Sequence, residues 1–136
     1  MQPIPYLFFN GECAEAMAFY ADLFGGEVTV KMPASDMPPE FPVPDERKSW
    51  VMHSEVKYGG GSLYGSDNIT GHADPMAGSA VMVSFDDKDA AEAAYNRLAD
   101  DGSVEMPFQP TFFSPGFGVV VDRFDKRWMI GVDTGP

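Results

Sequence analysis

Hydrophobic and polar residues follow one pattern that occurs twice along the chain. An alternating apolar stretch at 5–9 leads into an amphipathic helix at about 12–24, and a stretch at 79–85 leads into a helix near 88–100. The two copies match when the chain is shifted by seventy-six positions. The matched pairs include Leu7 with Val83, Phe9 with Phe85, Ala14 with Ala90 and Gly26 with Gly102. We therefore predict that one half-domain has been duplicated.

Both helices are predicted to bury one face and to end at glycine. The residues expected to face the core are Cys13, Met17, Tyr20, Phe24, Ala91, Ala94, Tyr95 and Leu98. Asn10 is the predicted N-cap of the first helix, and Asp86 or Asp87 is that of the second. Gly25 and Gly26 are expected to supply the left-handed stop of the first helix, and Gly102 that of the second.

The other apolar stretches predict further strands. They lie at 27–32, 50–57, 62–65, 103–107, 111–114, 117–122 and 127–132. Strands outnumber helices, and most strands follow one another directly, so we predict an α+β fold of tandem βαβββ modules with mostly antiparallel sheets. One domain is expected over 1–136, with modules at about 1–66 and 79–136 and a linker at 67–78. The working surface of such a fold is expected where the two copies meet.

Residues 33–49 form an irregular segment with five prolines. Proline fixes φ and removes a backbone donor, so an extended loop is predicted here and not a helix or strand. The second copy has no comparable segment, which makes the loop an insertion. Its role stays open between a lid over a pocket and a surface or dimer-contact loop.

Charge and cysteine content exclude several classes of function. The 136 residues carry a net charge of -12, from 21 acidic residues against 9 Lys and Arg. Such an acidic chain repels phosphate backbones and anionic lipids, so neither nucleic acid nor membrane is an expected partner. Cys13 is the only cysteine, so no internal disulfide can form. The start has no basic region or cleavage site of a secretion signal, and a cytoplasmic protein is expected.

Three segments carry a resemblance to a known family: PYLFFNGECAEAMAFYADLFGGE, VMHSEVKYGGGSLYGSD and MPFQPTFFSPGFGVVVDRFDKRWMI. They resemble the PhnB-like branch of the vicinal oxygen chelate superfamily, which includes glyoxalase I, bleomycin-resistance proteins and extradiol dioxygenases. The resemblance covers nearly the whole chain and implies curved sheets and a homodimer. Asp125 stands where the family usually has a turn glycine, and aspartate tolerates that conformation.

The resemblance also implies metal ligands on the first and last strands of each module. Mapped onto this chain, those positions fall near Pro5 or Tyr6, near Ala80, and at Met129 or Trp128. None of these side chains is a His, Glu or Gln, the types that suit a borderline divalent metal there. We therefore expect no metal and no other cofactor. A displaced divalent-metal site is the alternative, with candidate ligands His53, Glu55, His72 and Asp74.

Aromatic and polar side chains are the candidates for a small-molecule site. The predicted ligand-binding residues are Trp50, His53, Tyr64, Phe113, Arg127 and Trp128. His53 and Glu55 lie two residues apart on a strand and so share one face, which makes them the candidate catalytic pair. A hydrogen-bonded pair at a pocket wall or dimer interface is the alternative, and we prefer it to a metal site. Arg127 suits an anion, or a surface ion pair.

Three functions remain from the sequence. The first is a homodimer that binds a small molecule of unidentified structure without the usual metal. The alternative is a lyase or isomerase related to glyoxalase, which uses a displaced metal or His53 as general base with Glu55 orienting it. The third is a dimer that serves interaction. Members of the branch are sometimes labelled ubiquinone-biosynthesis methyltransferases, but no glycine-rich strand-to-helix loop is present, so we do not expect that activity.

Overall fold

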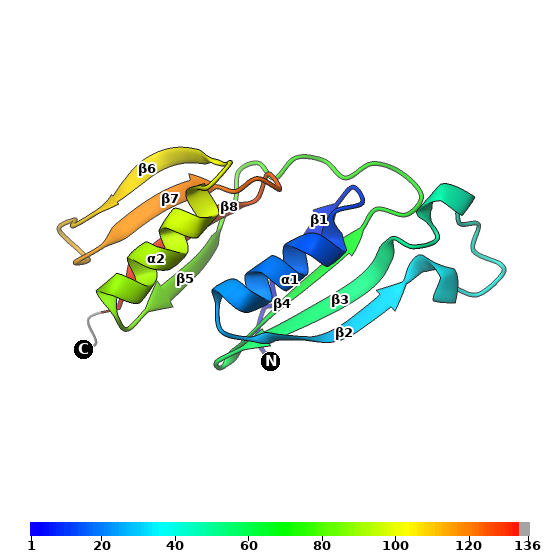
Figure 1. Ribbon diagram of the computed structural model, residues 1–136, viewed down its shortest axis with the longest axis horizontal. Helices are drawn as coiled ribbons and strands as arrows, with labels where there is room; N and C mark the ends of the chain where they lie inside the picture. Colours follow the sequence, from blue (N-terminus) through cyan, green and yellow to red (C-terminus); the bar gives the residue numbers. More distant parts are fainter. Residues whose placement is uncertain (134–136) are drawn as a thin grey trace. The chain divides into compact units, whose positions relative to one another are not determined.

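The computed structural model describes residues 1–133 and contains two compact units that divide between Asp74 and Pro75. Each unit holds one four-stranded sheet and one α-helix (Figure 1). The elements of the first unit are β1 (Tyr6–Phe9), α1 (Cys13–Leu23), β2 (Glu27–Pro33), β3 (Val51–Tyr58) and β4 (Gly61–Asp67). Those of the second are β5 (Val81–Phe85), α2 (Lys88–Ala99), β6 (Ser103–Gln109), β7 (Phe117–Val121) and β8 (Arg127–Val132).

The two sheets have the same topology. The first runs in the order β1-β4-β3-β2 and the second in the order β5-β8-β7-β6. In each sheet the first strand of the unit lies parallel to the last, and the other neighbours pair antiparallel. The predicted α+β class and tandem βαβββ modules are confirmed.

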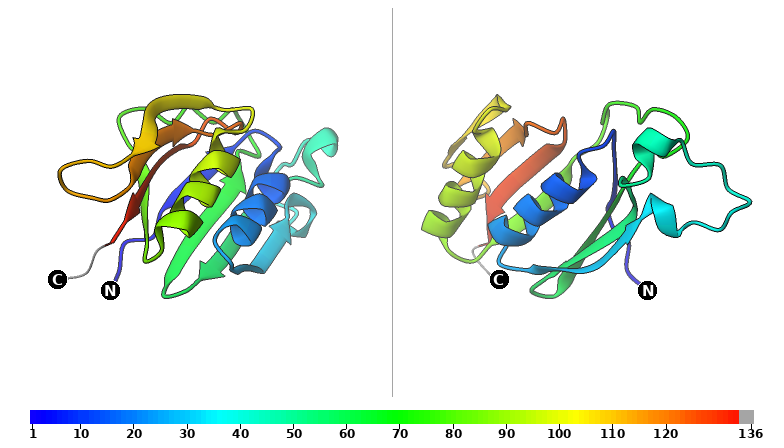
Figure 2. Two further views of the ribbon diagram at one scale, coloured as in Figure 1. Left: turned by 60° about the vertical axis from the view of Figure 1, so that its left-hand side comes forward. Right: turned by 45° about the vertical axis from the view of Figure 1, so that its right-hand side comes forward.

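Each helix lies across one face of the sheet in its own unit (Figure 2). The side chains predicted to face the core are buried in both helices: Cys13, Met17, Tyr20, Ala91, Ala94, Tyr95 and Leu98. Phe24 follows the end of α1 and is half-buried, with its ring centroid 5.4 Å from that of Tyr58. The helical spacing of apolar residues thus identified the packed faces, and its last member packs at the helix end.

The helix ends show the duplication at the level of single backbone angles. Gly25 has a φ of +68°, and Asp101, seventy-six positions later, has a φ of 58°. The left-handed residue of the second copy is therefore Asp101, and the prediction that Gly102 fills this role was wrong. Asp101 can adopt this conformation because aspartate is among the residues that tolerate it.

The N-terminus of α1 is capped from a distant strand. The prediction that Asn10 caps the helix was wrong, because its side chain bonds the backbone of Ala73, with its oxygen 2.6 Å from the amide nitrogen. The Asp67 carboxylate at the end of β4 accepts hydrogen bonds instead from the amides of Gly11 and Cys13, at 2.8 and 3.0 Å. A local motif could not reveal this cap, because its acceptor comes from more than fifty residues away.

The predicted strand at 111–114 is a turn. Thr111 Oγ1 accepts hydrogen bonds from the amides of Phe113 and Ser114, which folds these residues back on themselves. Thr111 N–H also donates to the Ser114 carbonyl at 2.9 Å. Local side-chain bonding therefore outcompetes strand pairing at this point.

Two other expectations for the second unit are confirmed. The Asp87 carboxylate accepts a hydrogen bond from the Ala90 amide at 2.9 Å and so caps α2. Asp125 has a φ of 63° in the turn before β8, which is the left-handed geometry expected from its replacement of a glycine.

The proline-rich segment 33–49 lies between β2 and β3 and contains two short 3-10 turns, Ala34–Asp36 and Asp45–Arg47 (Figure 2). Arg47 fixes it to the rest of the first unit. Its guanidinium donates to the backbone carbonyls of Asn68, Ile69 and Gly71 and lies 4.4 Å from the Trp50 ring centroid. The segment is thus an anchored loop, and its role as a lid or a contact stays a prediction.

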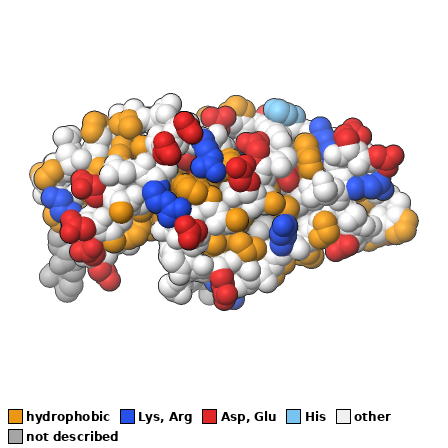
Figure 3. Space-filling model, in the orientation of Figure 1, with side chains coloured by type: hydrophobic (Ala, Val, Ile, Leu, Met, Phe, Trp, Pro, Cys, Tyr) orange, Lys and Arg blue, Asp and Glu red, His pale blue; other side chains and the backbone are white. Residues whose placement is uncertain are grey.

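Surface charge is mixed on the face shown in Figure 3, where acidic and basic side chains alternate with apolar ones. No broad basic patch gathers on the described part of that face, in keeping with the net charge of -12. Among residues 1–133, neither helix is long and apolar enough to cross a lipid bilayer.

Candidate functional site

A cluster of aromatic and ionisable side chains lies on the face of the first sheet opposite α1. We call it the aromatic face and define it as Tyr6, Phe8, His53, Glu55 and Tyr64. Strand alternation places it there, because the intervening residues of β1 are buried and the register pairs Tyr6 with Tyr64, and Tyr64 with Glu55. His53 and Glu55 thus share one face of the sheet, as predicted, and lie there with Tyr6 of β1 and Tyr64 of β4.

Three of these side chains form a hydrogen-bonded chain, which we call the relay. Glu55 Oε2 lies 2.8 Å from His53 Nε2, and His53 Nδ1 lies 2.9 Å from the Tyr6 hydroxyl. The His53 and Glu55 side chains are 21% and 22% exposed, whereas Tyr6 is 38% exposed. The relay therefore runs from a shielded carboxylate to a phenol that solvent or a ligand can reach.

Ring packing holds the relay in place. The Tyr6 and His53 rings are stacked at 5.7 Å between centroids, with an interplanar angle of 26°. The Tyr64 ring stands edge-on to His53, at 5.3 Å and 85°. Phe8, which is 55% exposed, lies 5.3 Å from Tyr6 and extends the apolar surface along β1. Stacked and edge-on rings are preferred arrangements, so the imidazole has little freedom to turn.

Tyr64 lies beside the same carboxylate, because the register of β3 and β4 pairs it with Glu55. Burial and the nearby charge of Glu55 raise the pKa of Tyr64 above its ordinary value. The Tyr64 phenol therefore stays protonated, and its edge-on ring helps to hold His53. The relay of Glu55, His53 and Tyr6 can bind a polar ligand atom or move a proton between a ligand and His53.

The residues at the superfamily's metal positions do not fit a metal site of the usual kind. Strand register and alternation give Tyr6 and Tyr64 in the first unit and Met82 and Met129 in the second as the side chains on the faces away from the helices. None supplies the nitrogen or carboxylate oxygen that such a metal needs. Within residues 1–133, no group of three or more His, Cys, Asp or Glu side chains is close enough to hold an ion.

The same face of the second unit is apolar. Met82 takes the place of Tyr6, and Phe117 and Val119 on β7 take the places of His53 and Glu55 in the corresponding register. A hollow of about 200 Å³ lies here. It is lined by Met82, Ser84, Phe113, Ser114, Phe117, Gly131, Val132 and Asp133. Phe113 was predicted to contact a ligand, and it lines this hollow of the second unit, not the aromatic face.

Trp128 is part of the core of the second unit. Its side chain is 0% exposed, and its indole Nε1 donates to Asp122 Oδ2 at 2.8 Å. The prediction that it contacts a ligand therefore needs correction: alternation along β8 turns Trp128 toward the buried side and leaves Met129 on the other.

Arg127 and Trp50 are also engaged in contacts of their own. Arg127 donates to Glu105 Oε1 at 2.9 Å and to the Ser79 carbonyl at 3.1 Å, which matches the ion pair foreseen as its alternative role. Trp50 lies beneath Arg47 and against Gly11, where an added Cβ would be 3.0 Å from the indole ring. Trp50 thus helps to anchor the proline-rich loop and is separate from the relay.

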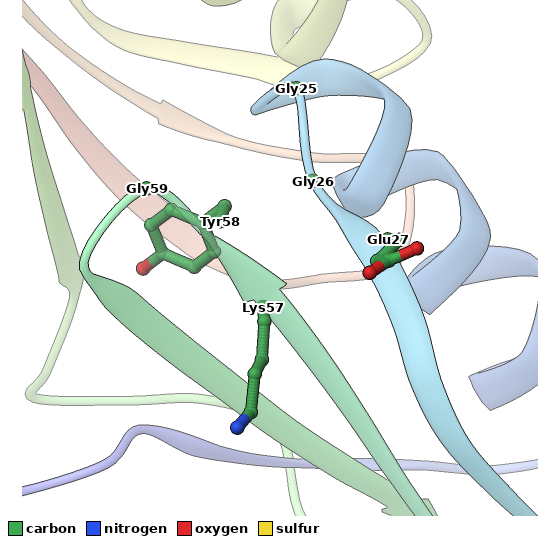
Figure 4. A pocket seen from close by; sticks show the side chains of 6 residues that line it. All are labelled: Gly25, Gly26, Glu27, Lys57, Tyr58 and Gly59. Atoms are coloured by element: carbon green, nitrogen blue, oxygen red, sulfur yellow. The ribbon is translucent and has the colours of Figure 1, made fainter.

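The first unit has a hollow of about 410 Å³ near the β3–β4 turn (Figure 4). Its lining consists of Gly25, Gly26, Glu27, Lys57, Tyr58 and Gly59. Glycines supply half of these residues, so few side chains could recognise a ligand, and Lys57 points away from Tyr58. The relay is the better candidate for a binding site, because three of its polar side chains converge.

Tyr6 and Phe8 are the site residues that sequence reasoning missed. Tyr6 entered only as a position where a metal ligand was lacking. The signal was the alternation of β1, which sends Tyr6 and Phe8 to one side and Leu7 and Phe9 to the other. Its use required knowing that β1 pairs with β4, the strand that carries Tyr64.

Comparisons with known proteins agree with this architecture. The model of the Glyoxalase/Bleomycin resistance protein/Dioxygenase superfamily matches residues 4–130. Protein YjdN of Escherichia coli strain K12 is 29% identical over 136 residues, with 94% of this chain and 92% of YjdN covered. The crystal structure of protein PA1353 from Pseudomonas aeruginosa is 36% identical, with 98% of each chain covered and a TM-score of 0.88. The PhnB protein from Bacillus cereus is 22% identical, with 98% of this chain and 100% of its own covered and a TM-score of 0.82.

Proposed function

Because this chain belongs to the Glyoxalase/Bleomycin resistance protein/Dioxygenase superfamily, we propose that it binds a small molecule on the aromatic face without the metal site usual in the superfamily. The relay from Glu55 through His53 to Tyr6 is the observation that carries this proposal. Ligand sites combine apolar surface with a few oriented polar groups, and the aromatic face has both.

A second candidate is an enzyme in which His53 acts as general base. The 2.8 Å bond to Glu55 favours it, because a carboxylate on one ring nitrogen orients the imidazole. Binding is preferred as the minimal role, since it needs only the contacts described. The homodimer, the cytoplasmic location and a ligand site where the two copies meet stay predictions.

Uncharged bicyclic aromatics are expected to bind the wild-type protein in saturation-transfer NMR, for example indole, quinoline and coumarin. Tyr6→Ala combined with Phe8→Ala removes two exposed rings, and the affinity should fall about tenfold at typical ring-contact energies. Phe112→Ala is the matched control, because Phe112 is a fully exposed ring of the second unit. Equal loss in the control, or no loss in the double variant, would contradict the proposal. If the wild-type protein slowly converts a bound compound and the His53→Gln variant does not, the result would favour the enzyme.

Metal content separates the metal-free proposal from its alternative. The purified protein is expected to contain zinc, nickel, manganese and iron only in substoichiometric amounts by mass spectrometry, because tyrosine and methionine occupy the paired strand positions on the faces away from the helices. A stoichiometric metal that is lost in the His53→Ala variant would contradict the metal-free proposal and support a site at His53. A stoichiometric metal that the variant retains would also contradict it and would indicate a site away from His53.

A further inference from the structure

The relay has a defined direction. A carboxylate only accepts hydrogen bonds, so the 2.8 Å contact requires the hydrogen of the neutral imidazole to lie on His53 Nε2 and to point at Glu55. His53 Nδ1 then carries the lone pair. The Tyr6 hydroxyl, 2.9 Å away, therefore donates its hydrogen to Nδ1.

This direction decides what Tyr6 can offer to a ligand. Its only hydroxyl hydrogen points inward to His53, which leaves the phenol oxygen with acceptor capacity alone. A ligand that meets Tyr6 therefore meets a hydrogen-bond acceptor.

The surroundings favour a flat, uncharged or cationic partner. Phe8 is 55% exposed beside Tyr6 and offers a ring face for stacking. The Glu55 carboxylate and the net charge of -12 both disfavour anions. Among aromatic molecules, those that also bring a hydrogen to donate are therefore expected to bind this face most tightly.

We propose that the aromatic face selects planar aromatic molecules with a hydroxyl or amine donor, and that Tyr6 is the residue that accepts this hydrogen. The inference rests on the proposed function, which it sharpens from a small molecule in general to one chemical class. Tyr6 sets specificity, whereas His53 and Glu55 act through it as positioning residues.

Phenol and anisole test the inference, because they share a ring and differ in the donor. In amide NMR titrations at pH 8, phenol should shift resonances of β1, β3 and β4 and bind about tenfold tighter than anisole. Tyr6→Phe keeps the ring and removes the acceptor, so phenol should fall to the affinity of anisole while anisole is unchanged. Tyr58→Phe is the control, since Tyr58 packs on Phe24 at the end of β3.

The outcomes distinguish the two proposals. Equal binding of phenol and anisole at this face, or a phenol preference that survives Tyr6→Phe, overturns the donor selection and leaves the proposed site intact. Absence of shifts in β1, β3 and β4 with both compounds, up to their solubility, overturns the site itself.

Discussion

Replacing Asp67 with alanine is expected to lower the free energy of unfolding more than any other single carboxylate change in the first unit. Its oxygens accept hydrogen bonds from the amides of Gly11, Cys13 and Val51 at 2.8, 3.0 and 2.9 Å, and the residue is 3% exposed. Three amides would lose their acceptor, at about 1–3 kcal/mol for each buried group left unpaired. Urea unfolding followed by circular dichroism should therefore show a loss of at least about 3 kcal/mol.

Asp87→Ala is the matched control, because Asp87 also caps a helix but accepts one exposed amide. It should cost about 1 kcal/mol. Asp67→Asn keeps one acceptor oxygen and should fall between the two. A loss for Asp67→Ala no larger than that for Asp87→Ala would show that the three amides find other partners.

Asp67 also connects stability to the candidate site. It joins the end of β4, the start of β3 and the first turn of α1, and these two strands carry Tyr64, His53 and Glu55. The relay depends on the register between those strands to within hydrogen-bond tolerance. The variant is therefore expected to disturb the aromatic face as well as the fold.

The fold was predictable because it depends on repeated local patterns. Helical spacing identified the buried faces of both helices, and strand alternation identified most strands. The errors lie where a side chain acts at a distance or against the pattern. Asparagine is a common N-cap residue, yet the carboxylate of the distant Asp67 accepts the hydrogen bonds at the N-terminus of α1 in place of Asn10. The Thr111 hydroxyl accepts a hydrogen bond from the Phe113 amide, which makes a turn of an apolar stretch that was predicted to be a strand.

The candidate site was only half predictable. His53 and Glu55 follow from period-two alternation within one strand. Tyr6 requires the pairing of strands far apart in sequence, which alternation alone cannot give. Trp128 shows a different kind of error. Its large ring suggested a ligand contact, but its position on β8 places the ring in the core, where its indole donates to Asp122.

Within residues 1–133, the relay occurs in one of the two copies. Where the first unit has Tyr6, His53 and Glu55, the second has Met82, Phe117 and Val119. What the copies share is backbone geometry, because the same strand order recurs around different side chains. Duplication therefore explains the fold, and divergence of the two faces explains why the relay occurs in the first unit and not at the equivalent positions of the second.

The shared backbone geometry predicts that equivalent glycines are equally intolerant of a side chain. A Cβ on Gly26 would lie 2.1 Å from the Lys57 carbonyl oxygen, and one on Gly102 would lie 2.3 Å from the Val121 oxygen. Since both obstacles are backbone atoms, Gly26→Ala and Gly102→Ala should each lower the unfolding free energy by about 3 kcal/mol in urea titrations. Gly60→Ala is the control, with no atom within 4 Å of the added Cβ and an expected change within about 0.5 kcal/mol. A neutral result at one of the two glycines and a large loss at the other would mean that the helix-to-strand connections of the two copies are not equivalent.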